Sequence, residues 1–409
     1  MNSIVRIGRR ISVPRNSIWI TDIPSYVTVS ASAICQRRRL NALWNKTNHV
    51  AIAMGAEGEW STTSSPGVSE HRARLHFGSS VRRCVEANEG APTVDSSASP
   101  VLVTGVPGRV GGVGSVIVEI LRCRGLPVRA LVRRQDQRTD ALRANGVEVV
   151  AGDLTEACDV ARALSGCRRM YFGMGVSSRY LEATVTTAAV AREHADLEVL
   201  VNISQMTVSQ MSLTEMTDSP QHRQHWLCEQ VLNWSSLPVV HVRPTVFLQH
   251  PFFSEWAAES IALDSTIRLP FGTGRTSPID ARDVAEVIAA ILMNPTAHIG
   301  KTYELTGPRS QDMPGVAAEY ADALGRPVRY VDMPFDQWRD QELGKRGLSE
   351  HLFEHFLTMA RLHAANRYDR LTHDVAAITG RPATTIRDFV AQHKALFDKH
   401  RSTLSPRPA

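Results

Sequence analysis

The sequence predicts an α/β fold in which helices cover both faces of a doubly wound parallel sheet. Three observations support this prediction: short apolar runs begin at Val101, stretches of helical periodicity separate them, and a glycine-rich turn follows the first run. Such runs are typical of strands buried on both faces, and their alternation with helices is typical of β-α-β units.

Six runs are expected to be the strands of this sheet, because each has the length of a strand and is followed by a turn or a helical segment. They are VLVT (101–104), VRALV (128–132), VEVVA (147–151), RMYF (169–172), VLVNI (199–203) and VVHVR (239–243). Beyond about residue 250 the sequence is more helical, with brief strand candidates at 302–305 and 328–331.

The net charge of +5 resides in the first quarter of the chain. Residues 1–98 hold 12 Lys and Arg against 7 Asp and Glu, whereas residues 99–409 hold 34 of each. The predicted folded part therefore has no basic excess for a polyanion, and we expect no nucleic-acid partner. No apolar run approaches the ~18 residues that a membrane span needs, so no membrane partner is expected.

The cysteines and the first residues of the chain help to predict the cellular compartment of the protein. The six cysteines show no paired spacing, which indicates reduced thiols in a cytoplasmic protein. The first 20 residues contain four arginines and no acidic residue, a composition that resembles a transit peptide. Organellar import is the alternative if the protein is made with this extension. The other interpretation is that translation starts at a later methionine.

The turn after the first apolar run predicts a dinucleotide site. Gly105, Gly108 and Gly111 form a G-x-x-G-x-x-G pattern between a strand and a helix. The first glycine permits a tight turn, the second lets the backbone approach a pyrophosphate, and the third packs the helix on the strand. The residues predicted to contact the cofactor here are Gly105, Val106, Pro107, Gly108, Arg109, Val110 and Gly111.

Two further loops are predicted to contact the cofactor. Arg133 and Arg134 end the second strand, where an arginine suits a 2′-phosphate, so NADP(H) is preferred and NAD(H) is the alternative. Solvated loop arginines would give the same sequence. In GDL (152–154), Asp153 and Leu154 follow the third strand; Asp153 is expected to contact adenine, to cap the next helix, or to do both.

The chain resembles the NmrA-like family of atypical short-chain dehydrogenases/reductases over roughly residues 100–398. The resemblance rests on VTGVPGRVGG, RALVRR, GDL, LPVVHVRPTVFLQ, SPIDARDVAEVIAAIL, KTYELTGP and ALGRPVRYVDMP. It implies a Rossmann domain that binds NAD(P), a smaller helical C-terminal part, and a cleft between them. Family members include NADPH-dependent quinone, azo and imine reductases, and regulators that sense the redox state of the nicotinamide.

With this resemblance, four parts are expected along the chain. Residues 1–98 form a disordered or wrongly included extension, and residues 99–250 form the NAD(P)-binding Rossmann domain. Residues 251–398 form a substrate subdomain with elements that return to the Rossmann domain, and residues 399–409 form a tail.

The predicted helix PQHRQHWLCEQVLNW (220–234) bears on catalysis. Active short-chain reductases carry a tyrosine and a lysine four residues apart on a helix. The resemblance places Gln221 at the tyrosine position and His225 at the lysine position. His225 is predicted to contact ribose or substrate, or to act as a general acid; the alternative is a polar helix histidine. Gln221 is expected near substrate, and His222 is expected at the surface.

A metal site was the other interpretation of this helix, because His222, His225 and Glu229 share one stripe. Zinc motifs on helices more often place two histidines four residues apart and take a third ligand elsewhere. We therefore expect no metal.

Residues after the later strands are the remaining candidates. Gly173 and Met174 follow the fourth strand, and Ser204 with Gln205 follows the fifth, where this class of fold binds its ligands. Ser204 stands where the superfamily often has a catalytic hydroxyl, although it would also end the strand. The resemblance implies that Phe247 faces substrate, that Arg243 and Pro244 are structural, and that Asp280 and Asp283 act as caps.

Two functions follow from these expectations. The first is NADPH-dependent reduction of a small electron-poor acceptor of quinone, azo or imine type by direct hydride transfer. The second is a catalytically silent NADP(H) sensor that acts through a protein partner. The missing tyrosine and lysine motivate the second, whereas a two-electron acceptor that needs little proton donation accommodates the first.

Overall fold

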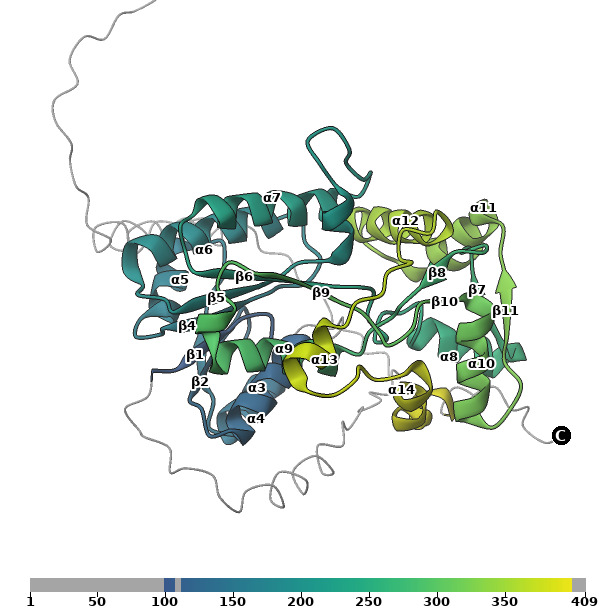
Figure 1. The fold of residues 1–409 in the computed structure, drawn as a ribbon, viewed down its shortest axis with the longest axis horizontal. Helices are drawn as coiled ribbons and strands as arrows, with labels where there is room; N and C mark the ends of the chain where they lie inside the picture. The colour runs from purple at the N-terminus through teal and green to yellow at the C-terminus, as the bar shows by residue number, and fades with distance from the viewer. Residues whose placement is uncertain (1–98, 107–111, 399–409) are drawn as a thin grey trace, which may run out of the picture. The chain divides into compact units, whose positions relative to one another are not determined.

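The computed structural model describes residues 99–106 and 112–398 (Figure 1). The expectations for residues 1–98 and 399–409, and for Pro107, Gly108, Arg109, Val110 and Gly111, lie outside the described residues. No helix within the described ranges is long and apolar enough to cross a membrane.

Seven parallel strands form the main sheet, in the order β3-β2-β1-β4-β5-β6-β9. The predicted α/β fold with a doubly wound parallel sheet is confirmed. The strands are β1 (Val101–Val103), β2 (Val128–Val132), β3 (Glu148–Ala151), β4 (Arg169–Phe172), β5 (Val199–Ile203), β6 (Val239–Pro244) and β9 (Thr302–Leu305).

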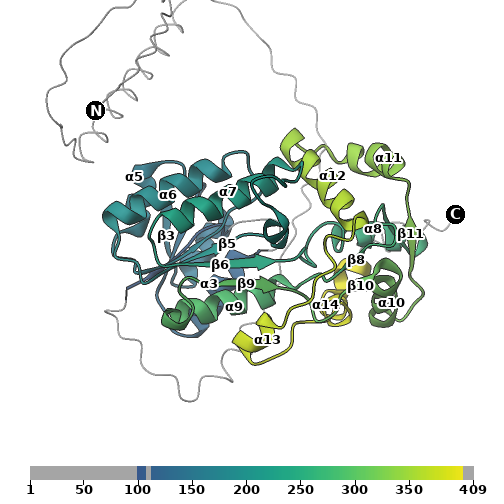
Figure 2. The ribbon, with the colours of Figure 1, turned by 45° about the horizontal axis from the view of Figure 1, so that its top comes forward.

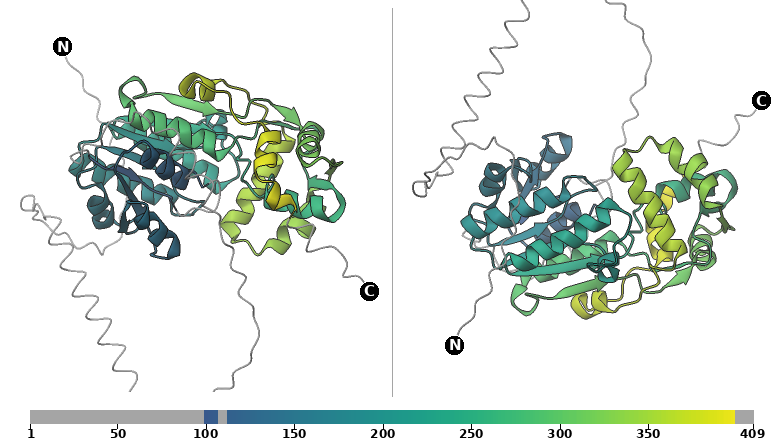
Figure 3. Two further views of the ribbon diagram at one scale, coloured as in Figure 1. Left: turned by 90° about the horizontal axis from the view of Figure 1, so that it is seen from below. Right: turned by 90° about the horizontal axis from the view of Figure 1, so that it is seen from above.

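Helices cover both faces of this sheet, as the two views in Figure 3 show face by face. One face carries α3 (Val113–Cys123), α4 (Gln137–Ala144), α9 (Ala281–Met293) and α13 (Asp374–Thr379). The other carries α5 (Ala157–Leu164), α6 (Tyr180–His194) and α7 (Pro220–Trp234). Each face has its own apolar core, because successive strand residues point to opposite sides.

The order of strands reverses between β1 and β4. Strands β2 and β3 extend the sheet to one side of β1, and β4, β5, β6 and β9 extend it to the other. At such a switch point the loops that leave the carboxyl ends of the strands diverge and open a crevice, which is where open α/β sheets bind ligands.

The C-terminal part has a separate core built around Phe252, Tyr320, Trp338, Phe356 and Phe389. Its elements, drawn in green and yellow in Figure 2, include two short two-stranded sheets, β10 with β8 and β11 with β7. They are α8 (Glu255–Asp264), β7 (Thr266–Leu269), β8 (Arg275–Thr276), β10 (Gln311–Asp312), α10 (Met313–Leu324), β11 (Arg329–Asp332), α11 (Phe335–Trp338), α12 (Glu350–Ala364) and α14 (Ile386–Gln392). Short 3₁₀ or π segments complete the described chain at Met206–Gln210, Pro295–Ala297, Arg339–Leu343 and Gly344–Arg346.

The chain enters the C-terminal part after β6 and returns to the sheet twice. Helix α9 and strand β9 come back first, and α13 packs on α9 after α12 has been completed. Helix α12 meanwhile lies against α7. The C-terminal part therefore reaches the carboxyl edge of the sheet, where the site is found.

Candidate functional site

The ends of β1 and β4 lie in direct contact at the switch point. The hydroxyl of Thr104 donates to the carbonyl of Gly173 at 2.7 Å and accepts from its N–H at 2.9 Å. Gly105 has a φ of +66°, and a Cβ on it would lie 2.6 Å from the Gly173 carbonyl oxygen. Gly105 is therefore required by close backbone approach, whereas a Cβ on Gly173 would lie 2.5 Å from the Tyr171 hydroxyl oxygen.

Helix α3 begins just after this contact. Gly112 precedes its first turn with a φ of 57°, and a Cβ on Gly114 would lie 2.9 Å from the Thr104 carbonyl oxygen. Gly114 thus makes the close helix-to-strand approach that the sequence assigned to Gly111, which lies outside the described residues. The α3 N-terminus is directed at the crevice and favours phosphate there.

A cavity of about 170 Å³ opens at the carboxyl edge beside the two glycines. Its lining comes from the ends of β1, β4, β5 and β6 and from α7 and α12. The sequence-predicted residues that line it are Gly105, Gly173, Met174, Ser204, Gln205, Gln221, His225 and Phe247. The described lining includes no Lys, Arg, Asp or Glu.

The side chain of Gln221 is held in one orientation. Its Oε1 accepts a hydrogen bond from the backbone N–H of Ser177 at 3.1 Å. Because a peptide N–H can only donate, this contact fixes which end of the amide is oxygen. His351 on α12 donates to the same oxygen from Nε2 at 2.9 Å, so the C-terminal part also holds the amide.

The fixed amide determines the tautomer of His225. The Gln221 nitrogen donates to His225 Nε2 at 3.1 Å, so Nε2 is the acceptor and the ring proton lies on Nδ1. Nδ1 is buried and has no hydrogen-bond partner among the described residues. Burial outweighs the opposing charge of Glu229 and lowers the pKa of His225 to about 4. A neutral ring that donates from Nδ1 is the form present at neutral pH, which argues against a general-acid role.

The expectation that His222 lies at the surface is wrong. Its side chain is buried, and its ring packs edge-on against His355 of α12 at a centroid distance of 4.9 Å. Burial, together with His355 and His225, lowers the pKa of His222 well below its usual value. Sequence alone could not place α12, from the other part of the chain, over the first turn of α7.

Glu229 on α7 is bound to Arg243 on β6. The carboxylate accepts from Arg243 Nε at 2.9 Å and from Nη2 at 2.5 Å. Burial raises the pKa of Glu229, but the hydrogen bond and charge of Arg243 outweigh burial and lower it. No group of three or more His, Cys, Asp or Glu within the described ranges is arranged to hold a metal ion.

Polar atoms without partners surround the cavity. Among the described residues, Gln205 Nε2, His225 Nδ1 and His250 Nε2 are buried and make no hydrogen bond. The Ser204 hydroxyl faces the Glu229 carboxylate and helps to lower the pKa of Glu229. Buried polar groups are normally paired, so unpaired atoms on one cavity indicate a polar ligand. Together with the Gly105–Gly173 contact, where any Cβ would intrude, they fit a nicotinamide nucleotide laid across the switch point with a polar substrate beside it.

A family model described as NAD(P)H-binding matches residues 108–295. The chain is also 30% identical over 297 residues to an NAD(P)H azoreductase of Xenophilus azovorans, and the match covers 71% of this chain and 98% of that protein. The chain belongs to the NAD(P)H-binding family that includes this azoreductase.

Solved structures share the family fold. An NADPH-dependent quinone oxidoreductase of Escherichia coli complexed with NADPH has a TM-score of 0.62 at 19% identity, covering 72% of this chain and 99% of that one. Nmra, a negative transcriptional regulator in complex with NADP, has a TM-score of 0.60 at 14% identity, covering 75% and 98%. The expected Rossmann fold of NmrA-like proteins is confirmed.

The residues predicted to contact the adenine side of the cofactor lie outside the cavity lining. Arg133 and Arg134 are exposed immediately after β2, and the charge of Arg133 helps to lower the pKa of Asp153. The largest cause of that lowered pKa is the N–H of Thr155, which donates to Asp153 Oδ1 at 3.0 Å. Leu154 is partly buried against the core beneath α5 and α6.

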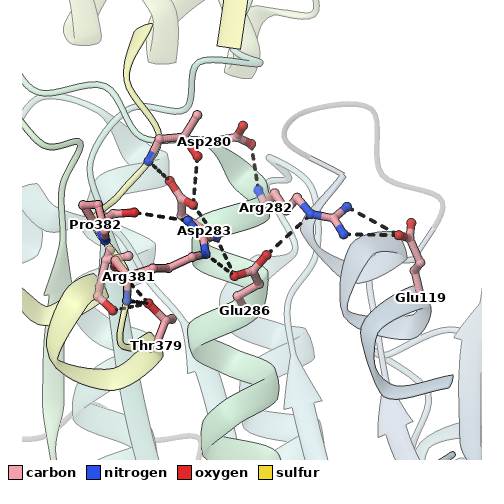
Figure 4. Close-up of polar contacts among 10 residues, drawn as sticks. Glu119, Asp280, Arg282, Asp283, Glu286, Thr379, Arg381 and Pro382 are labelled. Carbon is pink, nitrogen blue, oxygen red and sulfur yellow. Dashed lines mark hydrogen bonds and ion pairs between the residues drawn. The ribbon is translucent and has the colours of Figure 1, made fainter. Parts of the chain in front are cut away.

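The predicted capping role of Asp153 is wrong, because α5 begins at Ala157 and its N-cap residue is Glu156. Asp153 instead closes a turn through Thr155. Asp280 caps α9 by accepting from the N–H of Arg282. Asp283 lies within the first turn of α9 and, contrary to expectation, is not a cap: it binds Arg381 and Thr384 from the C-terminal part (Figure 4).

The lining residues that were missed from the sequence include four with polar, aromatic or thioether side chains: His250, His355, Met359 and Tyr368. His250 directly follows the RPTVFLQ segment that predicted Phe247, so that segment offered a signal for it. His355, Met359 and Tyr368 lie on or after α12, and nothing local to their sequence places them beside α7.

Proposed function

We propose that this protein is an NADPH-dependent reductase of a small electron-poor acceptor, of quinone, azo or imine type. The observation that carries the proposal is the cavity at the switch point, where the Gly105–Gly173 contact meets polar atoms of Gln205, His225 and His250 that have no partner among the described residues. The azoreductase that covers most of this chain supports the same class of reaction.

Bound NADPH supplies the hydride, and the side chains of the cavity bind and orient the acceptor. Phe247, Met359 and Tyr368 provide apolar and aromatic surface beside the polar atoms. His225 donates a hydrogen bond from Nδ1 to the acceptor or to the ribose. Because the ring is neutral and its other nitrogen is bonded to Gln221, it stabilises charge that develops on the acceptor without transferring its proton, and the proton that completes the reduction comes from water.

Selectivity for NADPH is proposed to come from Arg133 and Arg134. Both guanidinium groups are exposed after β2, near the position of the adenine ribose in this fold. A guanidinium matches the geometry of a phosphate, whereas no acidic side chain ends β2 to hold an unmodified ribose.

The test is NADPH oxidation by the purified full-length protein with a panel of quinones, azo dyes and imines. We expect oxidation above the buffer rate with at least one class, and faster oxidation of NADPH than of NADH. Oxidation at the buffer rate across the whole panel would refute the reductase function.

The regulator alternative makes a different prediction. A sensor must bind NADP and NADPH with different affinities, because equal affinities cannot shift an equilibrium. Calorimetry with both forms, on a protein that shows no turnover, would identify it. The likeness to the Nmra regulator, at 14% identity, extends to the fold alone and does not favour this alternative.

A further inference from the structure

The cavity presents hydrogen-bond donors whose proton positions are fixed by their neighbours. His225 carries its proton on Nδ1, because Nε2 accepts from the oriented amide of Gln221. His250 has the opposite tautomer: its Nδ1 accepts from the backbone N–H of Phe252 at 3.3 Å, so its proton lies on Nε2. Both protonated nitrogens are buried without a partner among the described residues, and both residues line the cavity.

Gln205 adds a third donor of the same kind. Its Oε1 accepts from the backbone N–H of Thr207 at 3.2 Å, which leaves its Nε2 as the end without a partner among the described residues. Three groups on the lining that have no partner among the described residues therefore donate. A ligand that satisfies them must carry acceptor atoms such as carbonyl oxygens.

The lack of charged side chains on the described lining restricts the chemical class of the ligand further. Burial lowers the pKa of His225 to about 4 and lowers the pKa of His250 well below its usual value, so both rings are neutral. No described lining residue is Lys, Arg, Asp or Glu. A sulfonate, phosphate or carboxylate on the substrate would lose its hydration without gaining a counter-charge, which is strongly unfavourable.

We propose that the cavity selects an uncharged dicarbonyl acceptor, with one carbonyl oxygen bound by His225 Nδ1–H and the other by His250 Nε2–H, and that Gln221 is the positioning residue that fixes the first donor. This inference rests on the proposed reductase function for its chemistry but not for the binding itself. It makes His225 and His250 specificity-determining residues and disfavours sulfonated or phosphorylated acceptors.

Because His225 and His250 have opposite tautomers, we expect different amide side chains to restore ligand affinity at the two positions. Asparagine places its N–H near the position of a histidine Nδ1, and glutamine places its N–H near Nε2. His225→Leu and His250→Leu should each weaken binding of neutral naphthoquinone by roughly tenfold, the cost of one buried hydrogen bond, in the protein bound to tetrahydro-NADP, whose uncharged ring cannot transfer a hydride. His225→Asn should restore affinity and His225→Gln should not, whereas His250→Gln should restore it and His250→Asn should not. His194→Gln, on the exposed side of α6, is the control.

Calorimetry gives these affinities without turnover, and nitrogen NMR of the imidazoles gives a second readout. The wild type should show His225 protonated on Nδ1, and Gln221→Leu should lose this preference, which a purely structural role of Gln221 would not change. Neutral naphthoquinone should bind at least ~10-fold more tightly than naphthoquinone sulfonate, since burying an uncompensated charge is costly. Equal affinity for the two, no binding of either, or equal rescue by Asn and Gln at both positions would overturn the inference.

The outcomes for binding and for turnover are separable. If His225→Asn and His250→Gln restore binding in a protein that oxidises no NADPH, the binding inference stands and the reductase function is refuted. If the protein oxidises NADPH but these two variants do not restore binding, the reductase function stands and the proposed roles of His225 and His250 are refuted.

Discussion

Arg243 Nε and Nη2 donate to the two carboxylate oxygens of Glu229, at 2.9 and 2.5 Å, and join β6 to α7. The Glu229 side chain is 2% exposed and that of Arg243 is 20% exposed. Glu229 lies one helical turn after His225, so the Arg243–Glu229 ion pair also fixes the position of His225 relative to β6 and the cavity. A second acid, Glu304 of β9, lies 3.6 Å from Arg243.

Arg243→Ala should lower the free energy of unfolding by ~3–5 kcal/mol, because it leaves the Glu229 carboxylate buried without its partner. Glu229→Gln should cost less, since Arg243 keeps Glu304 and partial access to water. Urea unfolding at neutral pH measures both. The double change Arg243→Met with Glu229→Leu is the matched control, and it should be less destabilising than Arg243→Ala alone. A double variant as unstable as Arg243→Ala would show that the charge pair is not the cause.

Arg133→Ala should weaken NADPH binding by ~10–100-fold and leave NADH binding within about twofold, because a charge-assisted contact to the 2′-phosphate is lost. Arg134→Ala is measured beside it, since both guanidinium groups are exposed after β2. Calorimetry with the two nucleotides separates this effect from general damage. Arg192→Ala, on the exposed side of α6, is the control. NADPH affinity unchanged in both single variants and in the double variant would remove these arginines from the cofactor site.

The sheet could be predicted from the sequence because its signal is local. Each of the six predicted runs became a strand of the main sheet within one residue of the predicted bounds, and 302–305 became β9. The cofactor edge followed from the same signal: Gly105 and Gly173 come directly after strands, and parallel strands bring their carboxyl ends to one edge.

The part of the cavity lining that α12 contributes could not be predicted, because it depends on contacts between segments that are distant in the sequence. His222 was expected at the surface, yet α12 covers it although His355 is 133 residues later in the chain. The tautomer of His225 depends on Ser177, which lies 44 residues before Gln221. Neither the burial of His222 nor the tautomer of His225 can be inferred from the periodicity or spacing of residues in α7.

Acid should destabilise this protein through its buried neutral histidines. Burial lowers the pKa of His355 and of His363 to about 3 from an ordinary value of 6.5. A depressed histidine pKa means that the unfolded chain binds more protons, so its contribution is complete above pH 6.5 and is lost as pH falls toward 3.

His363→Phe tests this at one position. The ring of His363 stacks between Phe271 and Tyr368, with centroid distances of 4.1 and 3.9 Å, so phenylalanine keeps the stacking and removes the titration. The free energy of unfolding should fall less steeply with acid in the variant, by up to ~1.4 kcal/mol per pH unit. Urea unfolding between pH 6.5 and 5 measures the slope. His194→Gln should reproduce the wild-type slope, and an unchanged slope in His363→Phe would contradict the assignment.

Asp283 anchors the segment that follows α13 to α9. Its Oδ2 accepts from the Thr384 N–H at 2.7 Å, and its Oδ1 accepts from Thr384 Oγ1 at 3.0 Å and Arg381 Nη2 at 2.8 Å. Arg381 also bonds to Glu286 one turn later on α9, as Figure 4 shows. The Asp283 side chain is fully buried, and burial raises its pKa against the lowering effects of Thr384 and Arg381.

Asp283→Ala should therefore leave the Thr384 N–H and part of Arg381 unsatisfied, at a cost of ~2–4 kcal/mol in the free energy of unfolding. Asp283→Asn keeps one acceptor oxygen and loses a charge that burial disfavours, so it should cost ~1 kcal/mol. Hydrogen exchange should quicken in residues 381–386 of the alanine variant, while amides of β1 and β4 exchange as in the wild type. Asp322→Ala, at an exposed position of α10, is the control. Faster exchange throughout the main sheet would instead indicate global unfolding, and unchanged exchange at 381–386 would show that Glu286 alone holds the segment.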